Sequence, residues 1–289
     1  MKRFFSILLA GAMGLSLLTG CGSSTTTDTS AEATTEAAES DLAYIQDKGV
    51  VTVGMTLFAP MNYYDDEDNF VGFDTELAQA AFEKMGLEVE FVEINWDTKE
   101  VELNSGNIDC IWNGLCITEE RKQNMSISDP YLLNTHALVM KADREEEIMA
   151  NGMKGLTVTS EQGSTCEEVA LGTADGDADA EVSGAEYFAE ANYVAVDSQA
   201  KSLMEVKAGT ADVAVIDTVA AAAMTGEGTD YEDLVFNTDN NFVTQYYGVA
   251  FRKGSDMTEQ LNAIIDEFYT DGTMASIAEK YNLTSILVK

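Results

Sequence analysis

Basic residues are scarce in this chain of 289 residues, which has 16 lysines and arginines against 51 aspartates and glutamates. The formal net charge is −35 at pH 7. Such a balance repels nucleic-acid phosphates and anionic lipid headgroups, which excludes nucleic acid as a partner. The acidic residues are spread along the chain, so they indicate a solvated surface and not a binding site.

Histidine and cysteine are also rare. The only histidine, His136, has no partner at the sequence spacing of a metal site, so we expect no metal and no other cofactor. Apart from Cys21, three cysteines remain, an odd number that cannot form a complete disulfide framework. Cys110 is expected in a buried strand. Cys116 and Cys166 could face one another in a pocket, either as free thiols or as a disulfide.

Apolar runs long enough to span a membrane are absent after the first twenty residues. Residues 1–20 begin with Lys2 and Arg3 and continue with a short apolar run, which is typical of a secretory signal peptide. The run ends in Leu18-Thr19-Gly20-Cys21, which resembles a bacterial lipobox. We therefore expect Cys21 to carry lipid and to anchor the protein at the outer face of the cell membrane.

The segment 21–40 consists mainly of serine, threonine, alanine and glutamate and has nothing to bury, so we expect a disordered tether. The rest, roughly 250 residues, exceeds one ordinary domain and suits two. We expect a first lobe from residues 41–135 and 244–289, and a second lobe from residues 136–243.

Predicted strands and helices alternate along the chain. Apolar runs predict strands at 50–55, 89–92 and 110–112, and amphipathic spacing predicts helices at 73–85 and 96–104. This β-α-β-α-β order indicates an open α/β sheet with helices on both faces. A second set follows, with strands at 136–140, 156–159, 193–196, 212–216 and 242–251 and helices at 198–208, 218–224, 257–269 and 274–281.

Ligands of open α/β sheets bind beyond the carboxyl ends of the strands. In the first lobe, Phe58, Trp96 and residues 113–116 all fall at such ends. Thr118 follows as a candidate N-cap, with Arg121 in the first turn of the next helix. A helix N-terminus favours an anion, and a guanidinium there could add a bidentate fork for a carboxylate. The local pattern leaves open that Arg121 is a surface residue paired with a nearby acid.

Several segments resemble, in order, motifs of the bacterial family of extracellular polar-amino-acid-binding proteins that serve ABC transporters. The resemblance is carried by VGFDTELA at 71–78, LNSGNID at 103–109, ITEER at 117–121 with SDPY at 128–131, DSQ at 197–199 with AGTAD at 208–212, YGVA at 247–250 and DGT at 271–273. It implies a two-lobe, periplasmic-binding-protein-like α/β fold (type II). Each lobe would be an open sheet flanked by helices, and two crossover strands would join the lobes.

The resemblance also implies a ligand site that closes on one amino acid. Arg121 would clamp the α-carboxylate, with help from the strand end and from the second-lobe turn, namely Asn113, Leu115, Cys116, Ser164 and Thr165. Asp217 would pair with the α-ammonium, and Phe58 would cover the ligand side chain. From local pattern alone, Asp217 could instead cap the helix at 218–224, and Phe58 could be a core residue. Cys116 stands where the family usually has serine or threonine.

The expected function is a lipid-anchored, monomeric binding protein that delivers an amino acid to an ABC transporter permease and performs no chemistry. Met55 lies near a position where binders of basic amino acids carry an acid, which disfavours a strongly cationic ligand. Two alternatives remain: a secreted dehydratase of the cyclohexadienyl type, and a ligand-sensing subunit of a receptor. A dehydratase needs a positioned general acid, for which the sequence offers Glu161 and Glu168 near the second-lobe turn.

The second lobe also has an acidic segment at 171–186. Its acidic side chains Asp175, Asp177, Asp179 and Glu186 fall at the spacing of a calcium-binding loop. The sixth position is Ala180 where glycine is required, so a solvated acidic loop is the favoured interpretation.

Overall fold

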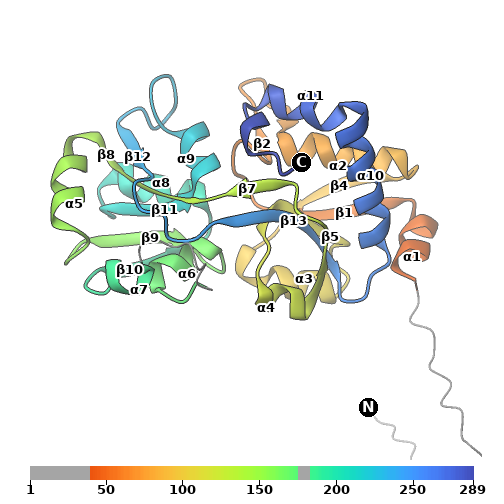
Figure 1. Cartoon of the computed structure of the whole chain (residues 1–289), viewed down its shortest axis with the longest axis horizontal. Coiled ribbons are helices and arrows are strands. Elements are labelled where there is room, and N and C mark those ends of the chain that lie inside the picture. Colours follow the sequence, from red (N-terminus) through yellow and green to blue (C-terminus); the bar gives the residue numbers. More distant parts are fainter. Residues whose placement is uncertain (1–39, 175–182) are drawn as a thin grey trace, which may run out of the picture. The chain divides into compact units, whose positions relative to one another are not determined.

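The computed structural model describes residues 40–174 and 183–289, which form one compact unit (Figure 1). The predicted signal peptide, Cys21 and almost all of the predicted tether lie outside the described residues, as do Asp175, Asp177 and Asp179 of the acidic segment. Within the described ranges, no helix is both long enough and apolar enough to cross a bilayer.

The first lobe is built on a mixed sheet in the order β4-β1-β5-β13-β6, with β7 also paired to β13. Its strands are β1 (Val50–Met55), β4 (Glu88–Glu93), β5 (Cys110–Cys116), β6 (Met125–Ile127), β7 (Leu132–Asn134) and β13 (Gln245–Arg252). β1 is parallel to β4 and β5, whereas β13 runs antiparallel to β5. The parallel strands therefore end at one edge of the sheet, where the predicted ligand residues follow them.

Helices cover both faces of this sheet (Figure 1). They are α1 (Asp41–Lys48), α2 (Phe73–Lys84), the 3-10 turn η1 (Trp96–Thr98), α3 (Lys99–Asn104), α4 (Glu119–Asn124), α10 (Met257–Asp271), α11 (Thr273–Lys280) and the 3-10 turn η3 (Thr284–Ile286), with a small hairpin of β2 (Tyr63–Tyr64) and β3 (Phe70–Val71). On the α2 face, Phe82 packs edge-on against Trp112 of β5. On the α3 face, Leu103 and Ile111 are buried in a separate apolar cluster. Apolar residues of β5 thus face helices on both sides, which explains why this strand is buried throughout.

The second lobe is built on a five-stranded sheet in the order β10-β9-β11-β8-β12. Its elements are β8 (His136–Lys141), the 3-10 turn η2 (Ala142–Arg144), α5 (Glu145–Asn151), β9 (Thr157–Glu161), α6 (Thr165–Leu171), α7 (Gly184–Tyr187), β10 (Asn192–Val196), α8 (Gln199–Ala208), β11 (Val213–Asp217), α9 (Thr218–Met224) and β12 (Leu234–Asn237). β9, β10 and β11 are parallel, and β8 is antiparallel to β11. Both lobes therefore have the open α/β sheet that the sequence predicts.

Two crossings join the lobes. Thr135 links β7 of the first sheet to β8 of the second, and the chain returns between β12 and β13. β7 and β13 run side by side as an antiparallel pair, with Gln245 opposite Asn134 (Figure 1). The predicted fold class, two lobes joined by two crossover strands, is confirmed.

Several strand boundaries differ from the sequence prediction. β5 continues through Asn113 and Gly114 to Cys116, because its pairing with β13 extends to Cys116 opposite Tyr247. β9 begins at Thr157 and runs on to Glu161, because β10 pairs with it over its whole length. The return strand begins at Gln245 and not at residue 242. The extensions of β5 and β9 carry polar residues to the ends of the strands.

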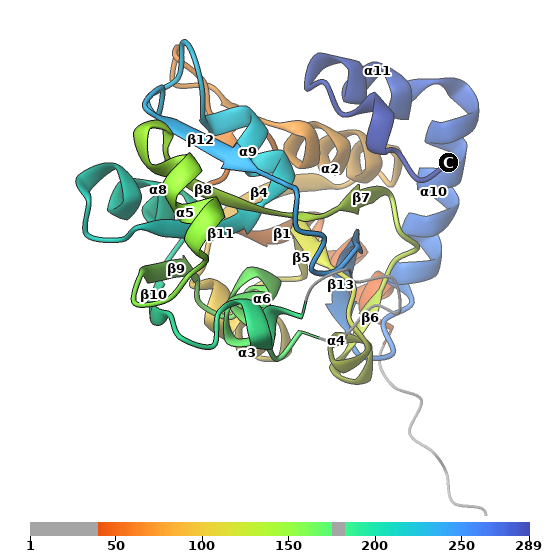
Figure 2. The same cartoon turned by 60° about the vertical axis from the view of Figure 1, so that its left-hand side comes forward.

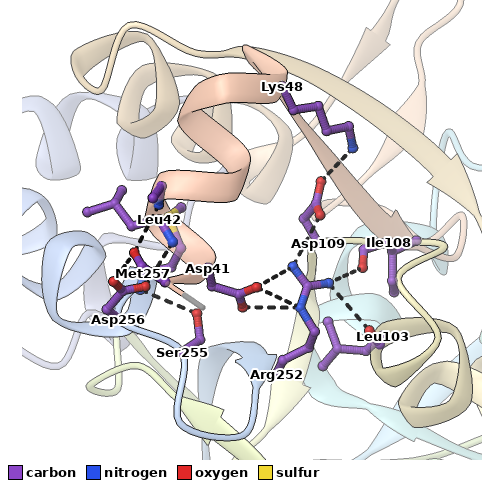
Figure 3. A network of polar contacts seen from close by, with 12 residues as sticks. Asp41, Leu42, Lys48, Leu103, Ile108, Asp109, Arg252, Ser255, Asp256 and Met257 are labelled. Carbon is purple, nitrogen blue, oxygen red and sulfur yellow. Dashed lines mark hydrogen bonds and ion pairs between the residues drawn. The ribbon is translucent and has the colours of Figure 1, made fainter. Parts of the chain in front are cut away.

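The first described helix, α1, is fixed to the first sheet by charge pairs (Figure 3). Arg252 of β13 donates from Nε to Asp41 Oδ1 at 2.9 Å and from Nη2 to Asp109 Oδ1 at 3.3 Å. Lys48, at the other end of α1, donates to Asp109 Oδ2 at 2.8 Å. Asp109 is buried, so this shared carboxylate holds helix and sheet together more firmly than a surface pair would.

Candidate functional site

A small pocket lies between the two lobes and is lined by residues of both. The lining residues are Phe58, Trp96, Asn113, Gly114, Cys116 and Arg121 from the first lobe and Glu161, Ser164, Thr165, Gln199 and Asp217 from the second. The pocket lies at the carboxyl ends of parallel strands of both sheets, as expected for open α/β folds.

Arg121 is buried in this pocket, 5% exposed, and is not a surface residue. Thr118 is the N-cap of α4, and its hydroxyl oxygen accepts a hydrogen bond from the Arg121 backbone N–H at 3.1 Å. The guanidinium donates from Nη1 to the carbonyl oxygen of Cys116 at 2.8 Å and from Nη2 to that of Gly163 at 3.2 Å. Both partners are neutral carbonyls, so the positive charge of Arg121 is available to an anionic ligand group.

The end of β5 is held in place by a buried carboxylate. Asp74 Oδ2 accepts a hydrogen bond from the backbone N–H of Gly114 at 2.7 Å, and Oδ1 accepts one from the Tyr131 hydroxyl at 2.9 Å. Burial raises the pKa of Asp74 to about 7. Gly114 itself has a φ of +55°, and a Cβ there would lie 2.8 Å from Phe58 Cζ. The glycine therefore lets the Phe58 ring pack directly against the strand end.

Asp217 is the last residue of β11 and holds the N-cap position of α9, but its side chain makes no capping hydrogen bond. Its Oδ1 accepts a hydrogen bond from the amide of Asn134, and its Oδ2 accepts one from the amide of Gln199 at 2.6 Å. Gln199 also accepts a hydrogen bond from the Asp217 backbone N–H at 3.0 Å. Asp217 therefore occupies the N-cap position without capping the helix through its side chain, and two amides orient its carboxylate in the pocket.

Ser164 and Thr165 lie at the start of α6, as predicted for the second-lobe turn. Ser164 is the N-cap of α6 and donates its hydroxyl to the carbonyl oxygen of Glu161 at 2.6 Å. Thr165 donates its hydroxyl to Cys116 Sγ at 3.3 Å, across the two lobes. Cys116 and Cys166 are both free, and burial raises the pKa of Cys116 to about 12. These cysteines therefore enter the site as neutral thiols and not as a disulfide.

Of the nine residues predicted to bind ligand, the pocket contains all but Leu115. The Leu115 side chain belongs instead to the apolar cluster on the α3 face of the first sheet. Side chains alternate along a strand, so Leu115 lies on the face opposite to Cys116. Phe58, 3% exposed, is both well packed and pocket-lining, so its two interpretations are compatible.

Glu161, Gln199 and Gly114 line the pocket but were not predicted as ligand residues. Glu161 is 2% exposed, and its Oε1 has no hydrogen-bond partner. Burial and the charge of Asp217 raise its pKa to about 8, against the opposing effect of Lys99. The signal that could have found it is positional: Glu161 directly precedes the turn that holds Ser164, at the end of a strand.

The two lobes also contact one another directly around the pocket. Lys99 Nζ donates to the carbonyl oxygen of Gly163 at 2.8 Å, and Gln162 Nε2 donates to Asp97 Oδ2 at 3.3 Å. Figures 1 and 2 place α3 and α6, the helices nearest these contacts, on the same side of the molecule. The structure therefore has the closed arrangement of the lobes, in which the pocket is enclosed.

One group of possible metal ligands lies beside the pocket, although sequence spacing did not indicate it. His136, Cys166 and Asp217 offer ligand atoms within 4.8 Å of one another. Both Asp217 oxygens already accept hydrogen bonds, and burial raises the pKa of the Cys166 thiol well above its usual value. A neutral thiol and an occupied carboxylate are poor ligands, so this group does not fit a metal site.

Comparisons with known proteins give a consistent picture. The model of the bacterial extracellular solute-binding proteins, family 3, matches residues 51–284. The L-cystine-binding protein TcyA of Bacillus subtilis is 30% identical over 243 residues, 83% of each chain. A solved ancestral arginine-binding protein bound to arginine is 30% identical, with a TM-score of 0.70. The match covers 81% of this chain and 98% of that one.

A second solved structure is relevant to the enzyme alternative. It is the ancestral amino acid-binding protein AncCDT-1, described as a precursor of cyclohexadienyl dehydratase. It is 27% identical with a TM-score of 0.71, and the match covers 84% of this chain and 99% of that one. The likeness to each of these proteins extends over most of both chains and so concerns the two-lobe fold as a whole.

Proposed function

The chain belongs to family 3 of the bacterial extracellular solute-binding proteins, and we propose that it captures a free amino acid and delivers it to an ABC transporter permease. Relatives that match over most of their length bind cystine or arginine by name. The family description places its members outside the cytoplasm.

The observation that carries the proposal is that a buried cation and a buried anion, from opposite lobes, line one small pocket. Arg121 comes from the first lobe and Asp217 from the second. A free amino acid at neutral pH has an anionic and a cationic end on one carbon atom. Arg121 binds the α-carboxylate, with Ser164 and Thr165 beside it, and Asp217 accepts hydrogen bonds from the α-ammonium.

Closure follows from this division of charges. Arg121 alone or Asp217 alone can hold one end of the ligand in an open form, but both ends are held only when the lobes meet. A ligand shifts an equilibrium by its difference in affinity for the two states, so an amino acid favours the closed state. A permease can then distinguish the loaded protein from the empty one by its closed surface.

Three further parts of the proposal concern the whole chain. Residues 1–20 are a signal peptide, Cys21 carries the lipid anchor, and residues 21–40 are the tether. The lobes are residues 41–135 with 244–289, and residues 136–243. The protein acts as a monomer, without a cofactor and without catalysis.

A thermal-shift panel tests the proposal. The protein lacking residues 1–21 is heated with each of the twenty amino acids and with cystine. A ligand at 100 times its Kd stabilises the folded state by about 2.7 kcal/mol, which is a readily measured shift in Tm. A panel without any shift contradicts the transport proposal. Turnover of prephenate or arogenate by the same preparation would instead establish the dehydratase alternative.

A further inference from the structure

Glu161 lines the pocket, but neither the α-carboxylate nor the α-ammonium of the proposed ligand is assigned to it. Its carboxyl group is buried at the end of β9 and lines the space between the lobes. Ser164 bonds to the backbone carbonyl of Glu161 and not to its side chain. A buried carboxyl oxygen without a partner costs on the order of 1–3 kcal/mol, so the site is incomplete until something donates to Oε1.

Two other polar side chains of the pocket, Asn113 and Gln199, already have partners. Asn113 donates to the carbonyl oxygen of Thr56 at 2.8 Å and to Asn62 Oδ1 at 2.7 Å, and its own Oδ1 accepts from Thr56. Gln199 is bonded to Asp217 through both atoms of its amide. Among the pocket-lining residues of the described chain, Glu161 alone has a buried polar side-chain atom left without a partner.

The surroundings of the Glu161 carboxyl group include charges of both lobes, among them Asp217 and Arg121, which are assigned to the two ends of the ligand. Its carboxyl group interacts with the Thr56 hydroxyl, just beyond the end of β1, and lies near the ammonium of Lys99. The rings of Phe58 and Trp96 line the same pocket. A ligand side chain with an aliphatic stem would pack against these rings, and a hydrogen-bond donor at its end would bind Glu161 Oε1.

We propose that Glu161 recognises the side chain of the bound amino acid, and that this side chain ends in N–H donors. The class includes amides, such as glutamine, and cations, such as arginine, lysine and histidine. The proposal rests on the proposed function, because it assumes that Arg121 and Asp217 hold the ligand backbone. Met55 then no longer disfavours a cationic ligand. The first lobe has no acidic side chain at that position, but Glu161 of the second lobe provides one.

The charges around Glu161 give the two subclasses different signatures. Asp217 raises its pKa, and Lys99 and Arg121 lower it, with a result of about 8 in the structure without ligand. The carboxyl group is therefore mostly protonated at pH 7. A cationic ligand side chain stabilises the ionised form, so its binding releases a proton, whereas an amide ligand leaves the protonation of Glu161 unchanged.

Calorimetry on the protein lacking residues 1–21 tests this inference. Lysine is compared with 2-aminoheptanoic acid, and glutamine with methionine, so that the two side chains of each pair have the same length but differ in the N–H donor. We expect the donor-bearing member of at least one pair to bind 10-fold or more tightly. Titrations in two buffers with different ionisation enthalpies detect the proton release that marks a cationic ligand.

Two variants identify the residue responsible. Glu161→Leu should reduce the preference for the donor-bearing ligand at least 10-fold. Glu161→Gln should do so for a cationic ligand but not for an amide, because a glutamine oxygen still accepts from a neutral N–H. Glu190→Gln is the control, since Glu190 is exposed in the same lobe and pairs with Lys154.

The outcomes are distinct from those of the proposed function. If no amino acid binds, the transport proposal fails. If amino acids bind but the donor-lacking members bind equally well, or if Glu161→Leu keeps the wild-type preference, the inference about Glu161 is overturned while the transport proposal stands. Should Glu161→Leu not fold, the wild-type comparison and Glu161→Gln decide the question.

Discussion

The ammonium of Lys99 donates a hydrogen bond to the backbone carbonyl of Gly163, 2.8 Å away, and thereby joins the two lobes. Lys99 is the first residue of α3 in the first lobe, and Gly163 belongs to the turn before α6 in the second. Lys99 is almost fully buried, and burial together with the charge of Arg121 lowers its pKa to about 7. The contact uses a backbone oxygen at the rim of the pocket, so it depends on closure and not on the identity of the ligand.

Lys99→Met should therefore weaken closure without removing any group that we assign to the ligand. We expect the Kd of the preferred amino acid to rise about 10-fold, because a hydrogen bond from a charged donor contributes roughly 1.5–3 kcal/mol. Calorimetry gives the Kd, and small-angle scattering with saturating ligand reports the closed fraction. Lys122→Met is the control, since Lys122 is exposed and pairs only with Glu119 of its own helix. Equal affinity in the two variants would show that the Lys99 contact does not stabilise closure.

Arg121→Ala should abolish the ligand-induced thermal shift. Truncating one partner of a buried charge pair costs about 2–5 kcal/mol, which corresponds to roughly a 30- to 5,000-fold rise in Kd. Arg121→Lys keeps the charge but loses the planar fork, so we expect an intermediate loss. Arg144→Ala is the matched control in the second lobe, where Arg144 pairs with Asp212 outside the pocket. If Arg121→Ala keeps the full thermal shift, Arg121 does not bind the ligand.

Gly114→Ala should reduce ligand affinity by displacing Phe58. The added Cβ would lie 2.8 Å from Phe58 Cζ and 3.2 Å from Tyr247 Cε2, closer than side chains tolerate. Gly106→Ala is a control with the same kind of backbone, because Gly106 also has a positive φ, of +78°, but has open space where its Cβ would be. Both variants carry the backbone penalty, so we expect only Gly114→Ala to lose affinity beyond its loss of Tm. Equal losses of affinity would mean that the position of Phe58 is unimportant.

Asp74→Asn should change how stability depends on pH. The pKa of Asp74 is about 7 in the folded protein against an ordinary 3.8, so the folded state binds the proton more tightly. The stability contributed by the protonated carboxyl is fully present below about pH 4 and is lost as the pH rises through 7. The wild-type free energy of unfolding should fall by at most about 4 kcal/mol over this range relative to Asp74→Asn.

Urea unfolding at pH 4, 5.5 and 7 measures this difference. Asp143→Asn is the control, because Asp143 lies on the exposed surface of the second lobe. Parallel pH profiles for wild type and Asp74→Asn would show that Asp74 is ionised in the folded protein at neutral pH.

Motif order along the chain predicted most of the site, although the residues are far apart in sequence. Arg121 and Asp217 are separated by 96 positions but line one pocket, as the resemblance implied. Arg121 follows the end of β5, and Asp217 is the last residue of β11. Both strands belong to parallel sets, whose carboxyl ends line the site of ligand binding. Leu115 does not line the pocket, because alternation along β5 places its side chain on the other face of the sheet.

Glu161 shows what local pattern does not reveal. The sequence placed the end of its strand two residues early, since pairing between β9 and β10 extends the strand beyond its apolar run. Whether a carboxylate at the end of β9 contacts solvent, a cation or no partner depends on the residues that the opposite lobe places beside it. The side chains that meet here belong to three separate segments of the chain, with Thr56, Lys99 and Glu161 as their members. No short stretch of sequence can therefore show that they are neighbours.

The amino-acid sequence by itself determined the alternation of strands and helices, the two-lobe class and the two charged residues on which the binding proposal rests. The alternation follows from hydrophobic periodicity. The two-lobe class and the roles of the two charged residues follow from the resemblance of the motifs, in their order along the chain, to those of the family. Only the tertiary structure decided that the Asp217 side chain does not cap its helix, that Cys116 and Cys166 are free thiols, and that Glu161 Oε1 lacks a hydrogen-bond partner. Those outcomes depend on which side chains from distant segments come within hydrogen-bond distance once the lobes close.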